Sequence, residues 1–508
     1  MAYEQLFAGA LVAFAAVLVL LQQFRRKSSL KLPPGPLSLP IIGCSHIVGR
    51  YPNAWDAFCD LRRRYGDVYS INLGSRRCLV VSSVDALREV LVTKATDFSD
   101  RPDSLRYHAI FKNNRNLSIA LCDWSSKQRT RRELCYPVMH PKHGTAEQTR
   151  LSNSVVTELG YLLSELSRCS GTAIKPRQAL LVTTANIFYT FFCSERFSPD
   201  DPKFLRIVGL YNEVFHQLFQ GFAIDFMPWL KVVQGKQLCL LREKSMEIYR
   251  FTLAIMDRRE NVIADGIGAQ VNHVRDLMDV LLLSLKDPST EGQLERVDVA
   301  VAIEDLIGGH SVIANLWVWC LYILSDYPDV QRKIREETRA ISSSEERLPS
   351  LLDRGRMCYT EATLYEIIRV VNSPIIPHVC SNDTTVQGFH VRRGTVVMFN
   401  TNDINYSSDL WEEPWDFKPE RFLSSDGQYV LKPGHFFPFG TGKRSCMGDG
   451  LVRATLILGM AALLGRFELS LAPGQEPARF ADFRSKVIFD RDPEIIFTEV
   501  SSRTQLPQ

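Results

Sequence analysis

The sequence has few features of a metal-cluster or disulfide-bonded protein. Its twelve cysteines are scattered through 508 residues, with no Cys-x-x-Cys pair and no spacing typical of a zinc site. This excludes a zinc-ribbon type of fold and does not fit the dense cysteine framework of small secreted domains. The pattern is typical of reduced thiols in a protein that faces the cytosol.

An excess of charge of one sign is also missing. Sixty basic and 57 acidic residues give a formal net charge of +3, which is too close to neutral for a nucleic-acid-binding protein. No Ser/Gly-rich linker, block of like charge, low-complexity tract or internal repeat divides the chain. Although length alone would suggest about three domains, we predict one large domain.

The N-terminus carries a long apolar run. Leu6 to Leu21 is uninterrupted, close to the roughly 20 residues that a membrane-spanning helix needs. Arg25-Arg26-Lys27 follows the run, so the positive-inside rule places the rest of the chain in the cytosol. A cleaved signal peptide fits poorly, because the basic residues come after the run. We predict a transmembrane anchor at 4–24, a basic and proline-rich hinge at 25–36 and one domain over 37–508.

The remainder reads as mainly α-helical with small β-sheets. Tyr69–Leu73 and Cys78–Ser82 have the composition of short strands around a turn. The pattern from 145 to 341 is helical, with few prolines. Residues 386–400 return to strand-like composition, and Arg392-Arg393-Gly394 predicts a hairpin turn there.

The segment 439–448, Phe-Gly-Thr-Gly-Lys-Arg-Ser-Cys-Met-Gly, is the most informative for function. It presents Cys446 in a glycine-punctuated loop, where tight backbone turns can aim N–H groups at a sulfur. Arg444 offers a charged planar fork that suits a carboxylate. A planar cofactor with an axial sulfur ligand and carboxylate arms would use all these features, and haem is such a cofactor. The alternative is a glycine-rich turn with an inert cysteine.

This segment resembles the haem-binding loop of the cytochromes P450, and the resemblance covers nearly the whole chain. Glu366-Ile367-Ile368-Arg369 matches the family's Glu-x-x-Arg, whose two residues share a helix face. Pro419-Glu420-Arg421-Phe422 lies between that motif and Cys446, as in the family. The resemblance implies a single large P450-fold domain in which Arg421 joins the first pair and the network braces the haem loop.

The resemblance also assigns residues to the cofactor, haem b. Cys446 should be the axial iron ligand, and the other implied haem contacts are Phe439, Gly440, Arg444, His378 and Arg132. His378 follows from Pro377-His378 with Asp383 five residues later, although a lone histidine is more often a surface or core residue. Arg132 is less direct, because the family's Trp-x-x-x-Arg is altered to Trp124 with Gln128; Arg129 is the second choice.

The oxygen-binding helix of the family should lie at 304–313, where this chain departs from the usual pattern. Most relatives carry an acid followed by threonine that deliver protons to oxygen. Alignment on Asp305 puts Val312 and Ile313 at those positions, whereas alignment on the glycine pair puts Ser311 and Val312 there. Three explanations remain open: Ser311 or His310 relays protons with water, the substrate supplies a hydroxyl, or oxygen is not split.

Gly308-Gly309-His310-Ser311 resembles the same stretch in the Spook-type P450s of arthropods. That resemblance implies a sterol substrate and an early step of ecdysteroid synthesis from 7-dehydrocholesterol. We expect an apolar substrate pocket, a catalytic role for His310 or Ser311, and a buried core histidine as the alternative for His310. The expected pocket residues are Ile307, Gly308, Ile375 and Ile376.

The main hypothesis is a membrane-bound haem-thiolate monooxygenase in the endoplasmic reticulum. Its implied partners are a sterol and NADPH–cytochrome P450 reductase, which basic residues such as Lys443 would attract; no nucleic acid is expected. Two alternatives remain. One is a haem isomerase or dehydratase that needs no reductase, and the other is a haem- and sterol-binding protein without turnover.

Overall fold

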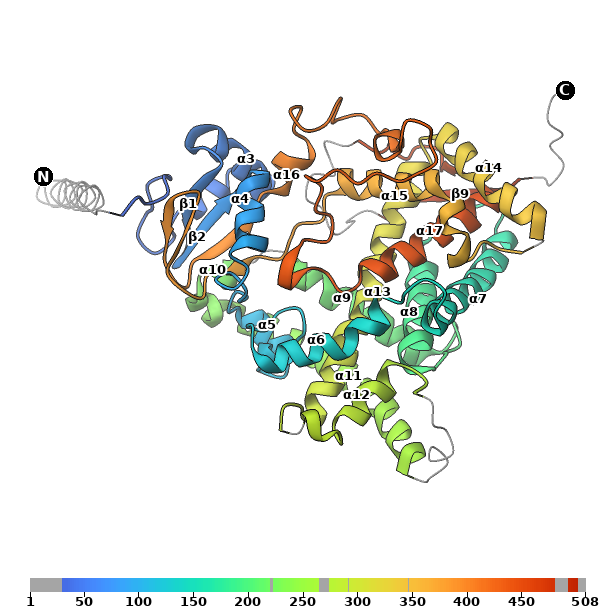
Figure 1. Ribbon diagram of the computed structural model, residues 1–508, viewed down its shortest axis with the longest axis horizontal. Helices are drawn as coiled ribbons and strands as arrows, with labels where there is room; N and C mark the ends of the chain where they lie inside the picture. Colours follow the sequence, from blue (N-terminus) through green and yellow to red (C-terminus); the bar gives the residue numbers. More distant parts are fainter. Residues whose placement is uncertain are drawn as a thin grey trace, which may run out of the picture.

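The computed structural model describes residues 30–219, 223–264, 274–290, 292–345, 347–479 and 492–500. The predicted anchor at 4–24 and the first part of the hinge lie outside these ranges. Within them the chain is mainly helical with three small sheets, as predicted (Figure 1). The sheet that contains β1 and β2 lies at one end of the molecule, and helices α7, α14 and α17 lie at the opposite end (Figure 1).

The bounds of the elements follow in chain order. The helices are α2 (Ser45–Val48), α3 (Ala54–Tyr65), α4 (Val84–Arg88), α5 (Leu105–Ile110), α6 (Ser126–Met139), α7 (Ala146–Arg168), α8 (Arg177–Cys193), α9 (Pro202–Phe219), α10 (Ala223–Phe226), α11 (Lys231–Ala264), α12 (Leu277–Ser284), α13 (Arg296–Leu324), α14 (Pro328–Glu345), α15 (Cys358–Val371), α16 (Thr401–Asn405) and α17 (Asp449–Arg466). The strands are β1 (Val68–Leu73), β2 (Arg76–Val81), β3 (Ala173–Ile174), β4 (His378–Val379), β5 (Thr384–Val386), β6 (Phe389–Val391), β7 (Val396–Phe399), β8 (Phe467–Leu471) and β9 (Ile495–Glu499).

The largest sheet has the order β1-β2-β7-β4. Strand β7 pairs in parallel with β2, with Cys78 opposite Val396, and antiparallel with β4. The predicted hairpin at 392–394 was therefore misplaced. The true hairpin is β5–β6, which turns at Gln387 and Gly388, whereas Gly394 leads into β7.

Helix α13 forms the centre of the helical part. Its length and composition would allow it to cross a membrane, but most of its apolar stretch is buried inside the protein, as in the core helix of a globular domain. Trp317 and Trp319 are almost fully buried in the largest hydrophobic cluster. A Cβ on Gly459 of α17 would lie 2.4 Å from the Trp317 ring, so glycine there permits the close approach of α17 to α13.

The proline-rich hinge is extended and docks on the main sheet. Ser70 of β1 donates its backbone N–H to the Pro34 carbonyl at 2.7 Å. A Cβ on Gly35 would lie 1.9 Å from the Ser70 carbonyl oxygen. The described end of the hinge is thus fixed against the domain by a contact that only glycine allows.

Candidate haem site and distal helix

The loop that presents Cys446 is held by a glycine contact. The short 3-10 helix η7 (Gly442–Arg444) precedes it, and α17 begins three residues after the cysteine. Gly442 has φ +74°, and a Cβ there would lie 1.9 Å from the Leu91 carbonyl oxygen, so only glycine fits. The backbone N–H of Cys446 donates to the Phe439 carbonyl at 2.9 Å, which closes the loop on itself.

Cys446 is an exposed residue. Desolvation raises the pKa of its thiol, and the backbone N–H of Gly448, which donates to Sγ at 3.3 Å, acts in the opposite direction. A bound ferric iron would stabilise the thiolate by coordination. The donor type, its accessibility and the N–H bond to sulfur all fit an axial iron ligand.

Two arginines lie beside this loop. Arg444 is buried, donates from Nε to the Ser99 carbonyl at 2.8 Å and also bonds to the Cys122 carbonyl. Arg132 of α6 donates to the Ser445 carbonyl at 2.9 Å. The structure thus brings together Arg444 and Arg132, and it leaves the second choice, Arg129, on the surface in an ion pair with Glu133 at 2.8 Å.

Sequence reasoning missed Arg101. This buried residue donates to the carbonyls of Ala120 at 3.0 Å and Ile376 at 2.8 Å. The predicted His378 is buried near it and donates from Nδ1 to the Phe98 carbonyl at 2.6 Å. An arginine before a proline in a loop has no periodicity to mark it, so Asp100-Arg101-Pro102 is only a weak signal in the sequence.

Arg101, Arg132 and Arg444 form a cationic cluster with His378 beside them; Arg132 is half-buried and the other three are buried. Within the described ranges, none of them makes an ion pair with a carboxylate. Burial and, second, the charge of Arg444 lower the pKa of Arg101 to about 9 and also lower that of Arg132. Burial and the charges of Arg101 and Arg444 hold the pKa of His378 well below its usual range. Such a cluster fits a dianionic group, as the two carboxylate arms of haem would provide.

One face of the middle of α13 carries a stripe of partly exposed residues. Asp305, Gly308, Val312 and Leu316 form this stripe, because they are spaced by three or four residues; Leu306 and Gly309 are also partly exposed but lie beside it. Ile313 is buried. Val312, not Ile313, therefore takes the partly exposed position, and this favours the alignment on the glycine pair.

Asp305 anchors the preceding loop to α13. Its carboxylate accepts hydrogen bonds from the Ser118 hydroxyl at 2.9 Å and from the N–H groups of Ile119 at 2.8 Å and Ala120 at 3.2 Å. With these bonds made, its role in the structure is to hold the loop. The remainder of the accessible stripe is glycine and aliphatic, without a proton donor on its side chains.

The structure places the predicted His310 and Ser311 away from the accessible stripe of α13. Both side chains are fully buried. The His310 ring packs edge-on against Tyr211 of α9, with centroids 5.2 Å apart, and against Phe188 of α8 at 6.4 Å. Helical spacing puts these two side chains off the stripe of Asp305, Gly308, Val312 and Leu316.

The burial of His310 predicts a pH effect on stability. Burial lowers its pKa to about 4, whereas the unfolded chain titrates near 6.5. As the pH falls from 6.5 to 4, the unfolded state takes up the proton first, so His310 removes up to about 1.4 kcal/mol of stability per pH unit. We expect the free energy of unfolding, measured with urea, to fall less steeply with decreasing pH in His310→Asn than in the parent protein across this range. An identical slope in both proteins would contradict a neutral, buried imidazole.

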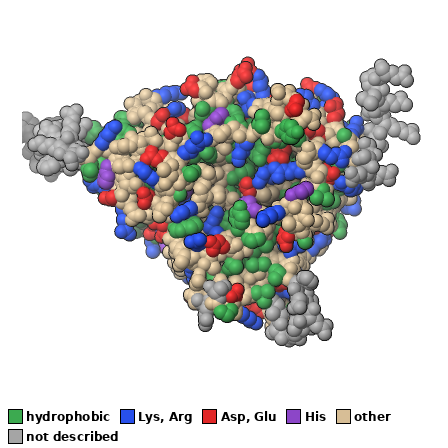
Figure 2. Space-filling view, in the orientation of Figure 1, with side chains coloured by type: hydrophobic (Ala, Val, Ile, Leu, Met, Phe, Trp, Pro, Cys, Tyr) green, Lys and Arg blue, Asp and Glu red, His purple; other side chains and the backbone are tan. Residues whose placement is uncertain are grey.

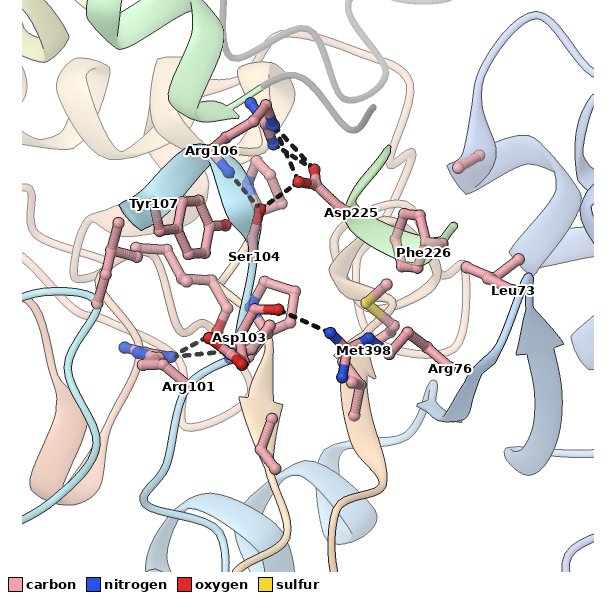
Figure 3. A pocket seen from close by; sticks show the side chains of 18 of the residues that line it. Leu73, Arg76, Arg101, Asp103, Ser104, Arg106, Tyr107, Asp225, Phe226 and Met398 are labelled. Atoms are coloured by element: carbon pink, nitrogen blue, oxygen red, sulfur yellow. Dashed lines mark hydrogen bonds and ion pairs between the residues drawn. The ribbon is translucent and has the colours of Figure 1, made fainter. Parts of the chain in front are cut away.

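A cavity of about 1020 Å³ lies between α3, α5, α10 and the main sheet. Ile375 and Ile376, two of the predicted pocket residues, line it. Its wall joins α5 to α10 through Arg106, which pairs with Asp225, and Ser104 bonds the same carboxylate (Figure 3). Much of the remaining lining is apolar, including the side chains Trp55, Phe58, Leu73, Phe226, Met227, Val379, Val396 and Met398.

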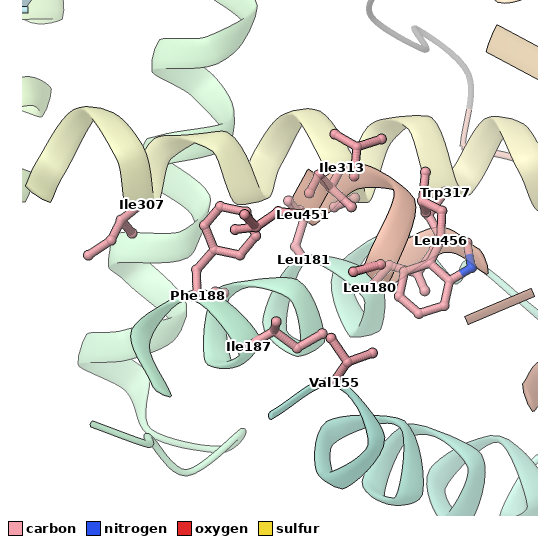
Figure 4. Packing of buried hydrophobic residues seen from close by; sticks show 14 of the residues in the cluster. Val155, Leu180, Leu181, Ile187, Phe188, Ile307, Ile313, Trp317, Leu451 and Leu456 are labelled. Atoms are coloured by element: carbon pink, nitrogen blue, oxygen red, sulfur yellow. The ribbon is translucent and has the colours of Figure 1, made fainter. Parts of the chain in front are cut away.

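Two other predicted pocket residues do not line this cavity. Ile307 is fully buried in the core and points to the same side of α13 as Phe188 (Figure 4). Gly308 belongs to the accessible stripe, and a Cβ there would lie 3.5 Å from the Tyr211 ring.

The predicted charge network is present. Both oxygens of Glu366 accept from Arg369, at 2.7 and 2.8 Å, and Arg421 donates to Glu366 at 3.0 Å. The Phe422 ring packs on Phe436, with centroids 5.0 Å apart, directly before the Cys446 loop. The network thus connects α15 to the segment that supports the loop.

Comparison with known proteins agrees with this geometry. The cytochrome P450 family profile matches residues 33–495. The chain is 35% identical to cytochrome P450 307a1 of Drosophila melanogaster over 461 residues, which is 86% of this chain and 84% of that protein. It is 30% identical to cytochrome P450 1A1 of Mesocricetus auratus, covering 88% and 86% of the two chains, and 28% identical to human cytochrome P450 2D6, covering 92% and 93%. The chain therefore belongs to the cytochrome P450 family of haem b monooxygenases.

Proposed function

We propose that this protein is a membrane-bound monooxygenase of a sterol in an early step of ecdysteroid synthesis, acting on 7-dehydrocholesterol or a close derivative. The observation that carries the proposal is the 35% identity to cytochrome P450 307a1 over 86% of the chain. The Gly308–Ser311 stretch, which resembles the Spook-type enzymes, supports it. The cavity of about 1020 Å³ has the size and apolar lining that suit a fused-ring lipid.

The cofactor contacts follow from the site. Cys446 would ligate the iron, while Arg101, Arg132, Arg444 and His378 would hold the two carboxylate arms. Haem, when bound, supplies the oxygen-activating chemistry. The chain's own residues anchor the cofactor, surround the sulfur with Phe439 and Gly440, and present the bare stripe of α13 toward the reacting side.

Because the cationic cluster would bind the carboxylate arms of haem, we expect variants that remove one of its charges to lose haem faster than the parent protein. A hydrogen bond to a charged group is worth about 1.5–3 kcal/mol, and each 1.4 kcal/mol is about a factor of ten. We expect Arg101→Leu to release haem to excess apomyoglobin about 10- to 100-fold faster. Arg129→Leu, which removes an exposed arginine of α6, should leave the rate unchanged. Equal rates in Arg101→Leu and the parent protein would remove Arg101 from the haem site.

Membrane attachment is supported by the surface near α10. Trp229, Val232 and Val233 are 55%, 93% and 77% exposed, and large apolar side chains exposed together are typical of an interface. Ser75 donates its N–H to the Phe226 carbonyl at 3.1 Å, which fixes this surface to the sheet that also carries the hinge. This arrangement supports contact of the domain with a membrane surface, in keeping with the proposed anchor at 4–24 and a location at the endoplasmic reticulum.

Reductase binding is supported by charge beside the Cys446 loop. Lys443 is exposed, and basic and acidic side chains are interspersed over the face drawn in Figure 2. An exposed lysine near the sulfur side would attract an acidic flavoprotein surface. NADPH–cytochrome P450 reductase is the partner that we propose.

The test is product analysis with reductase, NADPH and isotopically labelled oxygen on 7-dehydrocholesterol. Label in a new sterol product would support the monooxygenase and locate the carbon that reacts. A product without label that still needs NADPH and oxygen would indicate desaturation. A product that needs neither would favour the isomerase or dehydratase, and tight sterol binding without any product would favour the binding protein.

A further inference from the structure

The His310 imidazole makes two local contacts behind the glycine pair. Nδ1 lies 2.7 Å from the Ile307 carbonyl oxygen, and Nε2 lies 3.4 Å from the Ser311 hydroxyl. A carbonyl oxygen only accepts, so Nδ1 carries the proton and donates. In the neutral ring Nε2 is then the acceptor, and the Ser311 hydroxyl donates to it.

This tautomer has a consequence for Ser311. Its hydroxyl proton is directed toward His310 on the rear of α13, and the side chain is fully buried. The pair is thus closed on itself, with both members away from Val312 and the accessible stripe. Its geometry is that of a brace for the helix backbone.

The α13 backbone at Gly308 and Gly309 is the segment that this histidine would stabilise. Gly308 and Gly309 each cost a helix about 0.8–1.0 kcal/mol relative to alanine, because glycine leaves the chain conformationally free. A Cβ on Gly309 would lie 3.3 Å from the Phe188 ring. The glycine therefore lets α13 approach α8 closely, but it leaves the turn without side chains that would fix it.

We propose that His310 is a positioning residue that fixes the glycine turn of α13 through the Ile307 carbonyl, in place of the acid and threonine found in most relatives. The rings of Phe188 and Tyr211 pack against the imidazole, and the imidazole donates a hydrogen bond to the Ile307 carbonyl. This hydrogen bond fixes the glycine turn. The accessible side of the turn then stays flat and aliphatic, which excludes stray water from the oxygen-reacting side. This inference rests on the family's oxygen chemistry and does not depend on the identity of the sterol.

Two variants separate the contacts of the imidazole. In His310→Asn the short amide can place a nitrogen near the Nδ1 position and keep the bond to Ile307, whereas His310→Gln reaches only the Nε2 position. We expect amide hydrogen exchange across 307–314 to be about fivefold faster in His310→Gln, as for loss of one hydrogen bond, and unchanged in His310→Asn. This readout needs no turnover and no substrate.

The second readout is the fate of electrons with reductase and NADPH. We expect His310→Gln to release several-fold more hydrogen peroxide per NADPH than the parent protein, with unchanged haem content, and His310→Asn to restore the parent ratio. A purely structural role would instead lower haem content or melting temperature without this rescue. His46→Gln is the matched control, because His46 also bonds through Nδ1 to the carbonyl three residues earlier, at 3.2 Å, but lies on α2.

Two outcomes would overturn the inference. Equal hydrogen exchange in His310→Gln and the parent protein would show that the ring does not fix the turn. A loss of coupling in Ser311→Ala as large as in His310→Gln, with normal exchange across 307–314, would mean that the pair carries protons. Failure to find a sterol product would reject the proposed substrate without affecting either measurement.

Discussion

Cys446→Ala is expected to lose the thiolate-type spectrum of the reduced carbon monoxide complex and to form no detectable oxygenated product. The sulfur is accessible, receives the Gly448 N–H at 3.3 Å and lies in a loop closed by its own backbone bond to Phe439. Without a thiolate, the electron donation that favours O–O cleavage is lost. The fold should survive, because a single small truncation at an accessible site costs about 1 kcal/mol or less.

The measurement is a reduced carbon monoxide difference spectrum, with far-ultraviolet circular dichroism to show that the variant is folded. Cys239→Ala is the control, because Cys239 lies exposed on α11. Its spectrum and activity should match those of the parent protein. A thiolate-type spectrum that persists in folded Cys446→Ala would refute the assignment of the ligand and would require another of the twelve cysteines to bind iron.

Local patterns in the sequence predicted the parts of the fold that depend on neighbouring residues. The strands around Gly74 and the Glu366–Arg369 pair are set by alternation and by helical spacing, and both are present. The predicted hairpin at 392–394 was wrong because the pairing there is set by residues far away in the sequence. Strand β7 pairs with β2, more than 300 residues earlier, and no local pattern distinguishes that partner from an adjacent strand.

The haem site shows the same contrast between residues placed by a local motif and residues placed by long-range packing. Cys446 and Arg444 lie two residues apart in one motif, so their proximity follows from the sequence alone. Arg101 joins them only because its loop folds back against Ile376, a contact 275 residues apart in the chain. Charge clusters of this kind come from tertiary packing, and the sequence pattern around a single loop arginine does not contain them.

The distal helix could not be read from composition alone. Both alignments of 304–313 were consistent with a buried helix, and only the exposed face of α13 places Val312 on the accessible stripe. The role of His310 depends on which side of a largely apolar helix faces α8 and α9. The prediction of a buried core histidine described its position better than that of a catalytic group.

The second large effect concerns Glu366, which is fully buried with Arg369. Its carboxylate accepts four hydrogen bonds, two from Arg369, one from Arg421 and one from the Lys418 N–H at 2.9 Å. Glu366→Gln keeps the shape but removes the charge, so two guanidinium groups lose their counter-ion. Breaking a buried pair in this way costs about 3–5 kcal/mol.

We therefore expect Glu366→Gln to unfold at much lower denaturant concentration and to retain little haem, since Arg421, which precedes the Phe422 that packs on Phe436, then loses its carboxylate partner. Equilibrium urea unfolding and the haem-to-protein ratio measure the two effects. Glu336→Gln is the matched control, because Glu336 pairs with Arg332 at 2.9 Å on the exposed face of α14, where such a pair is worth about 0.3–0.5 kcal/mol. If Glu366→Gln cost no more than this control, the Asn405, Pro414 and Asp416 carbonyls would be sufficient to hold Arg369. The carboxylate would then have no part in bracing the haem loop.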